Sequence, residues 1–429
     1  MKFSVSRLLV EILVSIAFAI LVAAGALAWR LSQGPIDLEM FRGQVERSLE
    51  EARGGQPVKI DRLALEWVRD RGRIEAVARG FTAMDKGREV TFRANRAMIA
   101  LDAGALFTMK FKTQQLRLEN GAATVVRSAD GVWTLADMVI AKEPDPSDKP
   151  FDPIRDINWT TLATPIRALI SAGSFEQVEL SNFRLDVDDR KSNSTWSANP
   201  VAGLWKANRE GVSLTLNITL ADAIPGEPNR ISIALASDGQ VERAAATVKL
   251  EGVDPLSIAG MFGYTGDAFT SGRPASAAFS VAATERAGLL STSLSLSGVT
   301  GSVKIADQDV AVKNLAFDAS YDPTSKKVKL KLLALDSDWL SGQFTGELDA
   351  ASIMRGEAAP TPFALAGSGV TINAQPVFEN PWRFEQFSLQ GVLSIDQQQL
   401  TLTHIDAVTG GLTANGAGEV WLDMTGESP

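Results

Sequence analysis

Gly-Val-Ser-Leu-Thr-Leu-Asn-Ile-Thr-Leu, residues 211–220, is the clearest β-strand pattern in the chain. From Val212 onward apolar and polar side chains alternate, and successive side chains of a strand point to opposite faces of its sheet. The segment therefore predicts a strand with one apolar face and one polar face. Similar alternation elsewhere extends the candidate lining of an apolar groove to Val212, Leu214, Leu216, Ile218, Leu220, Ile231, Ile233, Leu235, Val328, Leu330 and Leu332.

The strand pattern also recurs at fixed offsets, which indicates stacked modules that cannot bury their apolar faces alone. At an offset of 90 residues, Val303, Ile305, Val310, Val312 and Leu315 are matched by Leu393, Ile395, Leu400, Leu402 and Ile405. At an offset of 72 residues, Leu340, Gly346, Glu347 and Leu348 are matched by Leu412, Gly418, Glu419 and Val420.

Few helices are predicted to cover these strands. A covered Val or Leu side chain contributes about 60–120 Å² of apolar surface, so five on one strand face make about 300–600 Å². One uncovered strand would thus approach the largest apolar patch of a typical monomer. The apolar face must be covered by a second sheet, by the same sheet curling on itself, or by a ligand. A closed sandwich or barrel and a curled sheet with an apolar groove both satisfy this requirement.

Composition excludes several classes of function. The formal net charge of −9 argues against a protein that binds nucleic acid or an anionic lipid surface, since both need clustered basic residues. The absence of cysteine excludes disulfides, zinc–thiolate sites and cysteine nucleophiles, and the single histidine, His404, leaves little for triad chemistry. We therefore expect no enzymatic activity, no cofactor and no metal site. The acidic residues at 186, 188 and 189 are expected in a solvated turn, and the lysines at 326–331 are expected to protect a sheet edge.

The N-terminal segment Leu8–Trp29 predicts a transmembrane helix. Its 22 residues would span roughly 33 Å, enough for the hydrocarbon core of a bilayer. Lys2 and Arg7 precede it and favour a cytoplasmic N-terminus. A cleaved signal peptide is the alternative, because Ala26-Leu27-Ala28 fits a cleavage site.

Helix, turn and proline signals along the chain predict the domain organisation. Leu38, Phe41, Val45 and Leu49 form one stripe of a short helix that covers the end of the following sheet, and Asn120-Gly121 predicts a hairpin turn. Two further short helices are expected after Thr164 and Asp254. Four prolines in residues 142–153 predict a linker. The expected parts are a membrane anchor (1–30), an α+β module that caps the sheet (31–141), the linker (142–153) and a repetitive β-groove region (154–429).

The chain resembles the AsmA-like family, in particular the N-terminal portion of its envelope-spanning TamB/YhdP-type members. The resemblance lies in the membrane segment followed by Gly34-Pro35-Ile36 and a short helix, and in the strand run Val58–Trp67. It continues through Val178–Asp189 and Leu250–Phe262 to the repeat in Val392–Leu422. It is a diffuse pattern over nearly the whole chain, without a catalytic signature.

The resemblance implies a mainly β fold: an elongated, curled antiparallel β-sheet, or half-pipe, with an N-terminal transmembrane helix and a few short helices. It further implies a single-pass inner-membrane protein whose bulk is periplasmic and whose groove carries phospholipid acyl chains toward the outer membrane. The partners it implies are phospholipid, the inner membrane, and the outer membrane or an envelope protein. A tethered scaffold or assembly factor for outer-membrane proteins is the alternative function, and an envelope enzyme or polysaccharide binder is a third.

Overall fold

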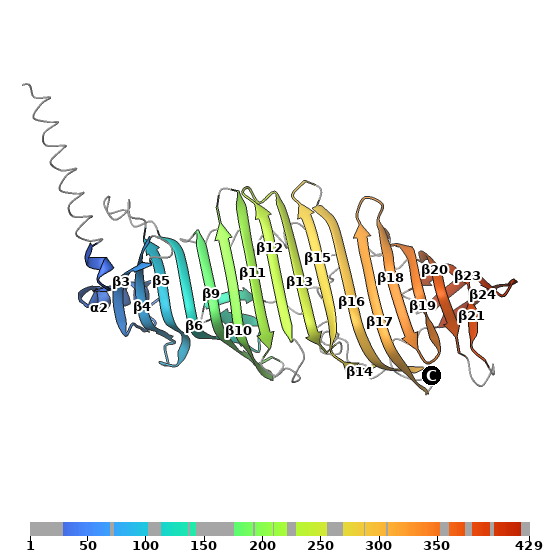
Figure 1. Ribbon diagram of the computed structural model, residues 1–429, viewed down its shortest axis with the longest axis horizontal. Helices are drawn as coiled ribbons and strands as arrows, with labels where there is room; N and C mark the ends of the chain where they lie inside the picture. The colour runs from blue at the N-terminus through green and yellow to red at the C-terminus, as the bar shows by residue number, and fades with distance from the viewer. Residues whose placement is uncertain are drawn as a thin grey trace, which may run out of the picture. The chain divides into compact units, whose positions relative to one another are not determined.

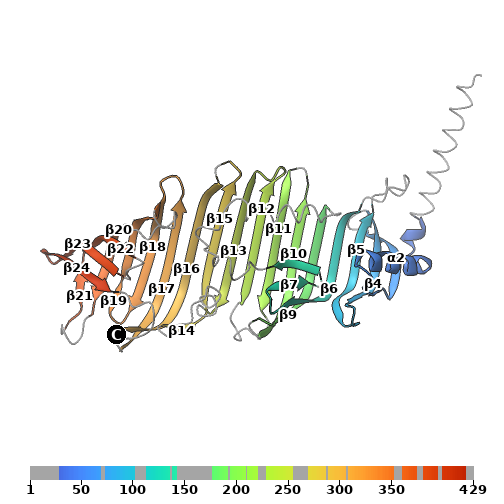
Figure 2. The same cartoon turned by 180° about the vertical axis from the view of Figure 1, so that it is seen from behind.

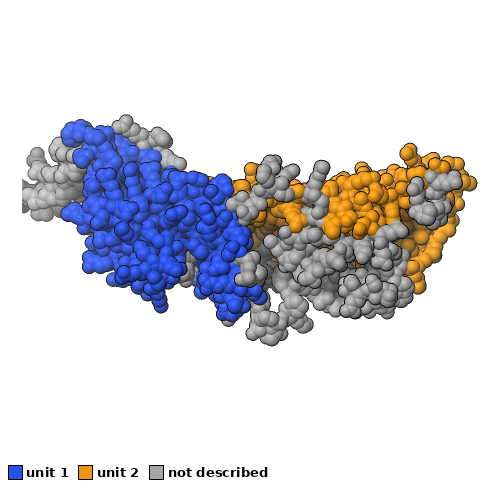
Figure 3. Space-filling model, turned by 90° about the horizontal axis from the view of Figure 1, so that it is seen from below, with its two compact units in different colours: residues 1–143, 174–204 blue, residues 144–173, 205–429 orange. Residues whose placement is uncertain are grey.

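The computed structural model describes residues 29–68, 73–101, 113–135, 138–142, 176–191, 194–208, 210–220, 229–254, 269–286, 288–305, 308–351, 360–373, 380–394 and 399–421. The chain forms two compact units, which Figure 3 colours separately. Unit 1 comprises residues 1–143 and 174–204, and unit 2 comprises residues 144–173 and 205–429. The fold is mainly β with few helices, as the alternating patterns predict.

Unit 1 is a mixed sheet rather than a purely antiparallel one. β3 pairs with β4, β4 with β5 and β5 with β6 in antiparallel register, but β6 and β9 run parallel. A parallel neighbour needs a crossover connection, and the chain between Arg127 and Gln177 provides it. The strands are β1 (Ile36–Asp37), β2 (Val58–Lys59), β3 (Arg62–Val68), β4 (Arg73–Met84), β5 (Val90–Leu101), β6 (Thr113–Arg127), β7 (Val132–Leu135), β8 (Met138–Lys142), β9 (Gln177–Asp189) and the first part of β10 (Ser194–Ala207).

The predicted helix is α2 (Glu39–Ala52), and it covers one edge of the sheet of unit 1. Asp37 Oδ1 accepts the backbone N–H of Glu39 at 3.0 Å, and Gly54 and Gly55 end the helix with positive φ. Two of its glutamates accept amides of the adjacent strand segment: Ile60 N–H donates to Glu46 at 2.8 Å, and Val58 N–H donates to Glu50 at 3.2 Å. The helix therefore satisfies amide groups that an open edge would leave for another strand.

The predicted hairpin at Asn120-Gly121 is wrong, because β6 continues through both residues. Asn120 has a φ of 51° and Asn182 on β9 has a φ of 52°, and their side chains form a 2.6 Å hydrogen bond. Gly80 on β4, with a φ of 64°, lies at the same level of the sheet. The asparagine–glycine pair therefore marks a bend that crosses several strands in register, since both residue types tolerate the left-handed conformation.

Unit 2 is an open antiparallel sheet whose strands lie side by side in nearly their order along the chain (Figures 1 and 2). β14 and β21 pair only beside the ends of β16 and β20, so twelve strands form its body. Within the described residues no pairing joins β24 to β11, so this sheet does not close on itself. The strands are β11 (Gly211–Leu220), β12 (Arg230–Asp238), β13 (Arg243–Val253), β14 (Phe269–Arg273), β15 (Ala275–Thr284), β16 (Gly288–Ile305), β17 (Gln308–Asp322), β18 (Lys327–Ser337), β19 (Leu340–Asp349), β20 (Thr361–Ile372), β21 (Trp382–Phe384), β22 (Gln386–Ser394), β23 (Gln399–Thr409) and β24 (Leu412–Trp421).

The 90-residue repeat is confirmed as a pair of equivalent hairpins in unit 2. In the β16–β17 hairpin Val303 pairs with Val310, and in the β22–β23 hairpin Leu393 pairs with Leu400. The pairings Gly301–Val312 and Val299–Leu315 have the counterparts Gly391–Leu402 and Leu389–Ile405. The 72-residue repeat likewise relates β19 to β24.

Both offsets correspond to the same length of chain per strand. From β16 to β22 there are five strand-to-strand steps, and from β19 to β24 there are four. Offsets of 90 and 72 residues thus both average 18 residues per step. The two repeats therefore agree in the average length of chain per strand, although the individual steps differ in length.

Several glycines of unit 2 lie beneath a large side chain of the neighbouring strand. A Cβ atom at Gly346 would lie 2.1 Å from the carbonyl oxygen of Ala364 and 2.7 Å from the side chain of Leu365. A Cβ atom at Gly418, the counterpart of Gly346 in the 72-residue repeat, would meet nothing within 4 Å. The two glycines therefore differ in space although they match in sequence.

This difference makes a prediction about stability. We expect Gly346→Ala to lower the free energy of unfolding by about 1–3 kcal/mol, because the strand pair must shift to admit the methyl group. Gly418→Ala is the matched control, and it should be neutral or slightly stabilising since alanine loses less backbone entropy than glycine. Urea denaturation of the two full-length variants measures both values, and equal losses would contradict the close contact at Gly346.

The expected domain boundaries meet the structure only in part. The expected linker lies, apart from Lys142, outside the described residues, as do residues 1–28 of the expected membrane anchor and the two short helices expected after Thr164 and Asp254. Residues 176–204, expected within the groove region, belong to unit 1 because β9 pairs with β6. In the part of the chain that the structure describes, no helix has the length and apolar character needed to span a bilayer.

Candidate apolar binding face

One face of the sheet of unit 2 is apolar from β11 to β24. Residues that pair directly across antiparallel strands point to the same side, so the strand register identifies the members of each face. The central row of this face runs without interruption through Leu216, Ile233, Val248, Phe279, Leu294, Ala319, Leu330, Gly346, Leu365, Leu389, Ile405 and Gly416. We call this side of unit 2 the apolar face.

The two neighbouring rows are almost equally free of polar groups. Their only polar members are Thr292 and Tyr321, and burial followed by the charge of Asp322 raises the pKa of Tyr321 above its ordinary value. One row contains Leu214, Leu235, Ala246, Val281, Thr292, Tyr321, Val328, Leu348, Phe363, Gly391, Leu402 and Gly418. The other contains Ile218, Ile231, Leu250, Ala277, Leu296, Phe317, Leu333, Phe344, Gly367, Phe387, Ala407 and Ala414.

The opposite face of the same sheet carries mainly hydroxyl, amide, charged and alanine side chains. Its central row is Thr215, Ala234, Thr247, Ser280, Ser293, Ser320, Lys329, Glu347, Ala364, Gln390 and His404. The hydroxyls of Ser280 and Ser293 are 2.6 Å apart. This face is suited to water, so the sheet presents two chemically different surfaces.

The apolar face is open at its centre and packed at its far end. Leu294, in the central row, keeps 46% of its surface exposed, and most of the leucines and isoleucines of that row are only half-buried. Near β19–β23, in contrast, Phe344, Val370, Phe384 and Ala407 form a buried cluster to which Leu333, Leu340, Ile372 and Phe387 add. A hydrocarbon ligand would therefore find uncovered surface at the middle strands rather than at the cluster.

The structure brings together most of the residues that alternation predicted as groove lining. Leu214, Leu216 and Ile218 pair with Leu235, Ile233 and Ile231 on the apolar face. Val328 and Leu330 lie on the same face several strands away, and Val212 opposes Ser237 at its margin. Leu220 ends β11, where its N–H donates to Asn229 at 3.0 Å.

Leu332 lies on the other side of the sheet. The register between β17 and β18 shifts between Asp318 and Ala319, so Leu332 opposes Asp318 whereas Leu330 opposes Ala319. Leu333 replaces it on the apolar face, opposite Phe317 and Phe344. Strict alternation through residues 328–332 was wrong because an extra residue in one strand moves every later side chain to the other face.

Two further expectations about charged segments need correction. β18 lies between β17 and β19, so its lysines do not protect an edge; Lys327 instead bonds to Glu347 at 2.6 Å. The acidic residues expected in a solvated turn belong to the end of β9. Asp189 is buried, and its carboxylate accepts a hydrogen bond from the Arg127 guanidinium at 2.8 Å.

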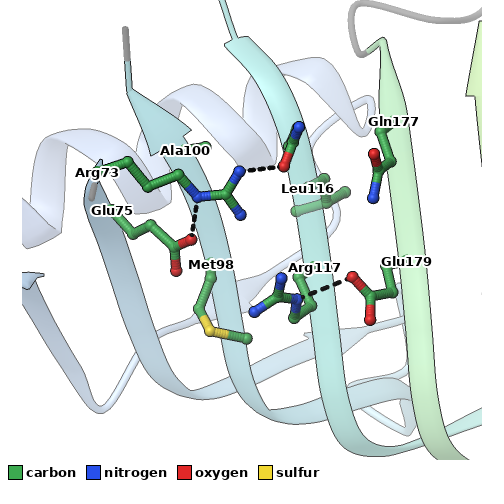
Figure 4. Close-up of a pocket in the computed structure, with 9 residues that line it drawn as sticks. Arg73, Glu75, Met98, Ala100, Leu116, Arg117, Gln177 and Glu179 are labelled. Carbon is green, nitrogen blue, oxygen red and sulfur yellow. Dashed lines mark hydrogen bonds and ion pairs between the residues drawn. The ribbon is translucent and has the colours of Figure 1, made fainter. Parts of the chain in front are cut away.

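A network of ion pairs on unit 1 was not predicted from the sequence. Buried Glu75 accepts Arg73 Nε at 2.7 Å, Arg73 also donates to Gln115, and Arg117 donates to Glu179 at 3.0 Å (Figure 4). These side chains, together with Met98 and Leu116, line a small surface pocket. The partners Arg117 and Glu179 are 62 residues apart and meet only through the parallel register of β6 and β9, so no local pattern could reveal them.

The network continues over the neighbouring strands, where Glu66 accepts both Arg79 and Arg96 at 2.7 Å. Each charge has an opposite charge beside it, which ties the strands together and leaves little net attraction for an ionic ligand. His404 bonds to Asp406 at 2.8 Å on the surface, and the described residues contain no group of acidic or histidine side chains that could hold a metal ion.

Comparison with known proteins adds no family, since no protein-family model, no curated protein and no solved structure matches the chain.

Proposed function

We propose that this protein binds phospholipid acyl chains along the apolar face of unit 2. The observation that supports the proposal is the unbroken apolar row across twelve strands, with Leu294 nearly half exposed at its middle. Acyl chains are held by the removal of apolar surface from water, which requires continuous lining rather than polar contacts at fixed positions. We further propose that the sheet of unit 2 curls into a half-pipe with the apolar face on its inner side.

The proposed physiological role is lipid transfer by a non-enzymatic protein. In this proposal the apolar segment Leu8–Trp29 holds the chain in the inner membrane, the two units lie in the periplasm, and phospholipid moves along the sheet toward the outer membrane. The resemblance of the sequence to AsmA-like proteins supports this assignment. A tethered scaffold for outer-membrane protein assembly remains the alternative, and it would not require lipid on the apolar face.

A photo-crosslinking experiment tests lipid occupancy directly. The full-length protein would carry a photoreactive amino acid at Leu294 on the apolar face or, as the control, at the exposed Ser291, which pairs with Ala282 on the polar face. After irradiation in cells and purification, we expect phospholipid adducts at position 294 and few at position 291. Mass spectrometry of the peptide spanning β16 measures both.

The two outcomes that oppose the proposal are distinct. Absence of adducts at 294 would favour the scaffold alternative, and equal adducts at both positions would indicate contact with bulk membrane rather than occupancy of the apolar face.

A further inference from the structure

The outer edge of β24 has no strand beside it among the residues that the structure describes. In the described part of the chain β24 (Figure 1) pairs with β23 alone. Its residues from Leu412 to Glu419 are all exposed. An unpaired edge presents a row of N–H and C=O groups, and proteins usually protect such edges with lysine, proline or a covering element. β24 contains no lysine or proline and a single charged residue, Glu419. At the edge of unit 1, in contrast, glutamate side chains of α2 accept hydrogen bonds from the edge amides.

The 72-residue repeat shows what such an edge accepts elsewhere in the chain. β24 is the counterpart of β19, since Leu402–Gly418 and Leu400–Val420 repeat the pairings Leu330–Gly346 and Val328–Leu348. The far edge of β19 is filled by β20, which runs antiparallel to it. In that pairing Gly346 opposes Leu365, and Leu348 opposes Phe363.

The space beside the two matched glycines differs accordingly. At Gly346 the volume that a Cβ atom would occupy is taken by the backbone of Ala364 and the side chain of Leu365. At Gly418 the same volume is open, with nothing within 4 Å. β24 thus matches β19 in its pairing on one side, but the space that β20 fills beside Gly346 is open beside Gly418.

We propose that the free edge of β24 binds an antiparallel β-strand from a partner polypeptide. By the equivalence with β19, that strand places a branched aliphatic residue opposite Gly418 and an aromatic residue opposite Val420, with small or polar residues between them. Main-chain hydrogen bonds supply affinity in this mode of recognition, and alternate side chains supply register. The proposal does not depend on acyl-chain binding, because the edge amides lie in the plane of the sheet rather than on the apolar face.

The test uses the strand that occupies the equivalent edge as a probe. A peptide with the sequence of residues 361–372 would carry Ala364→Cys, and the full-length protein, which has no cysteine of its own, would carry Glu419→Cys. Ala364 opposes Glu347, the counterpart of Glu419, and paired residues on antiparallel strands lie within disulfide reach. We expect roughly tenfold more disulfide product with this peptide than with one carrying Ser368→Cys, since register is strongly specified where one face is apolar.

A second variant checks the open space itself. Gly418→Leu fills the volume that the leucine of the probe would enter, so in the Glu419→Cys background it should abolish the disulfide product. Equal products with both peptides, no product with either, or a disulfide-linked dimer of the protein as the main species would each overturn the proposal. The dimer would instead identify the edge as a contact between two copies of this chain.

Discussion

Replacing Leu216 by aspartate is expected to leave the protein folded while reducing the phospholipid that co-purifies with it. Leu216 belongs to the central row of the apolar face and is only half-buried. A charge in a closed core would be left unpaired and would prevent folding, but on an open face it can remain hydrated. Acyl chains that pack over it would have to remove that water, so we expect bound phospholipid to fall by at least about twofold.

Thr215→Asp provides the matched control, because Thr215 is the adjacent residue of β11 and lies exposed on the polar face. Thermal unfolding and lipid quantification per folded molecule are measured together for both variants. If Leu216→Asp fails to fold while the lipid content of its folded fraction is unchanged, the strand lies in a closed core and the acyl-chain proposal is wrong.

Phe344→Ala should cause the largest loss of stability among single substitutions on the apolar face. Phe344 is only 5% exposed, its ring lies against Phe387 with centroids 6.3 Å apart, and it occupies the space above Gly367. Truncation removes this contact and leaves a cavity, which typically costs about 3–5 kcal/mol for a buried phenylalanine. Urea denaturation of the full-length protein measures the change in the free energy of unfolding.

Leu294→Ala is the control on the same face. Leu294 keeps 46% of its surface exposed, so about half of its burial free energy is at stake and its truncation should cost only about 1 kcal/mol. Similar losses for the two variants would show that the apolar face is packed uniformly, and an open binding region at its centre would then be excluded.

The sequence predicted the strands of unit 2 well because the alternation of apolar and polar residues within each strand identifies its two faces. The alternation in β11 was sufficient to assign Leu214, Leu216 and Ile218 to one side, and β12 followed in the same way. The 90-residue and 72-residue repeats predicted equivalent strands because apolar register survives even where residue identity does not. Alternation could also have identified β16, whose Leu294 and Leu296 lie between serines, as part of the same face.

Other features depend on how neighbouring strands pair, which the alternation within one strand does not indicate. The shift that moves Leu332 away from Leu330 results from one extra residue in β18, and nothing in the local sequence marks it. The left-handed bend at Asn120 uses a dipeptide that equally suits a tight turn, so only the neighbouring strands decide between them. The ion pairs of unit 1 depend on the parallel pairing of β6 with β9, which the alternation within neither strand could indicate.

The antiparallel pairing of each strand of unit 2 with the next has a consequence for how this sheet can change in length. Each strand adds about 4.8 Å to the width of the sheet and reverses the direction of every strand that follows it. Insertion of one strand would therefore reverse the direction of the outermost strand relative to a partner that binds beside it. Insertion of two strands would restore that direction. Lengths that keep the same outer contact are thus separated by even numbers of strands.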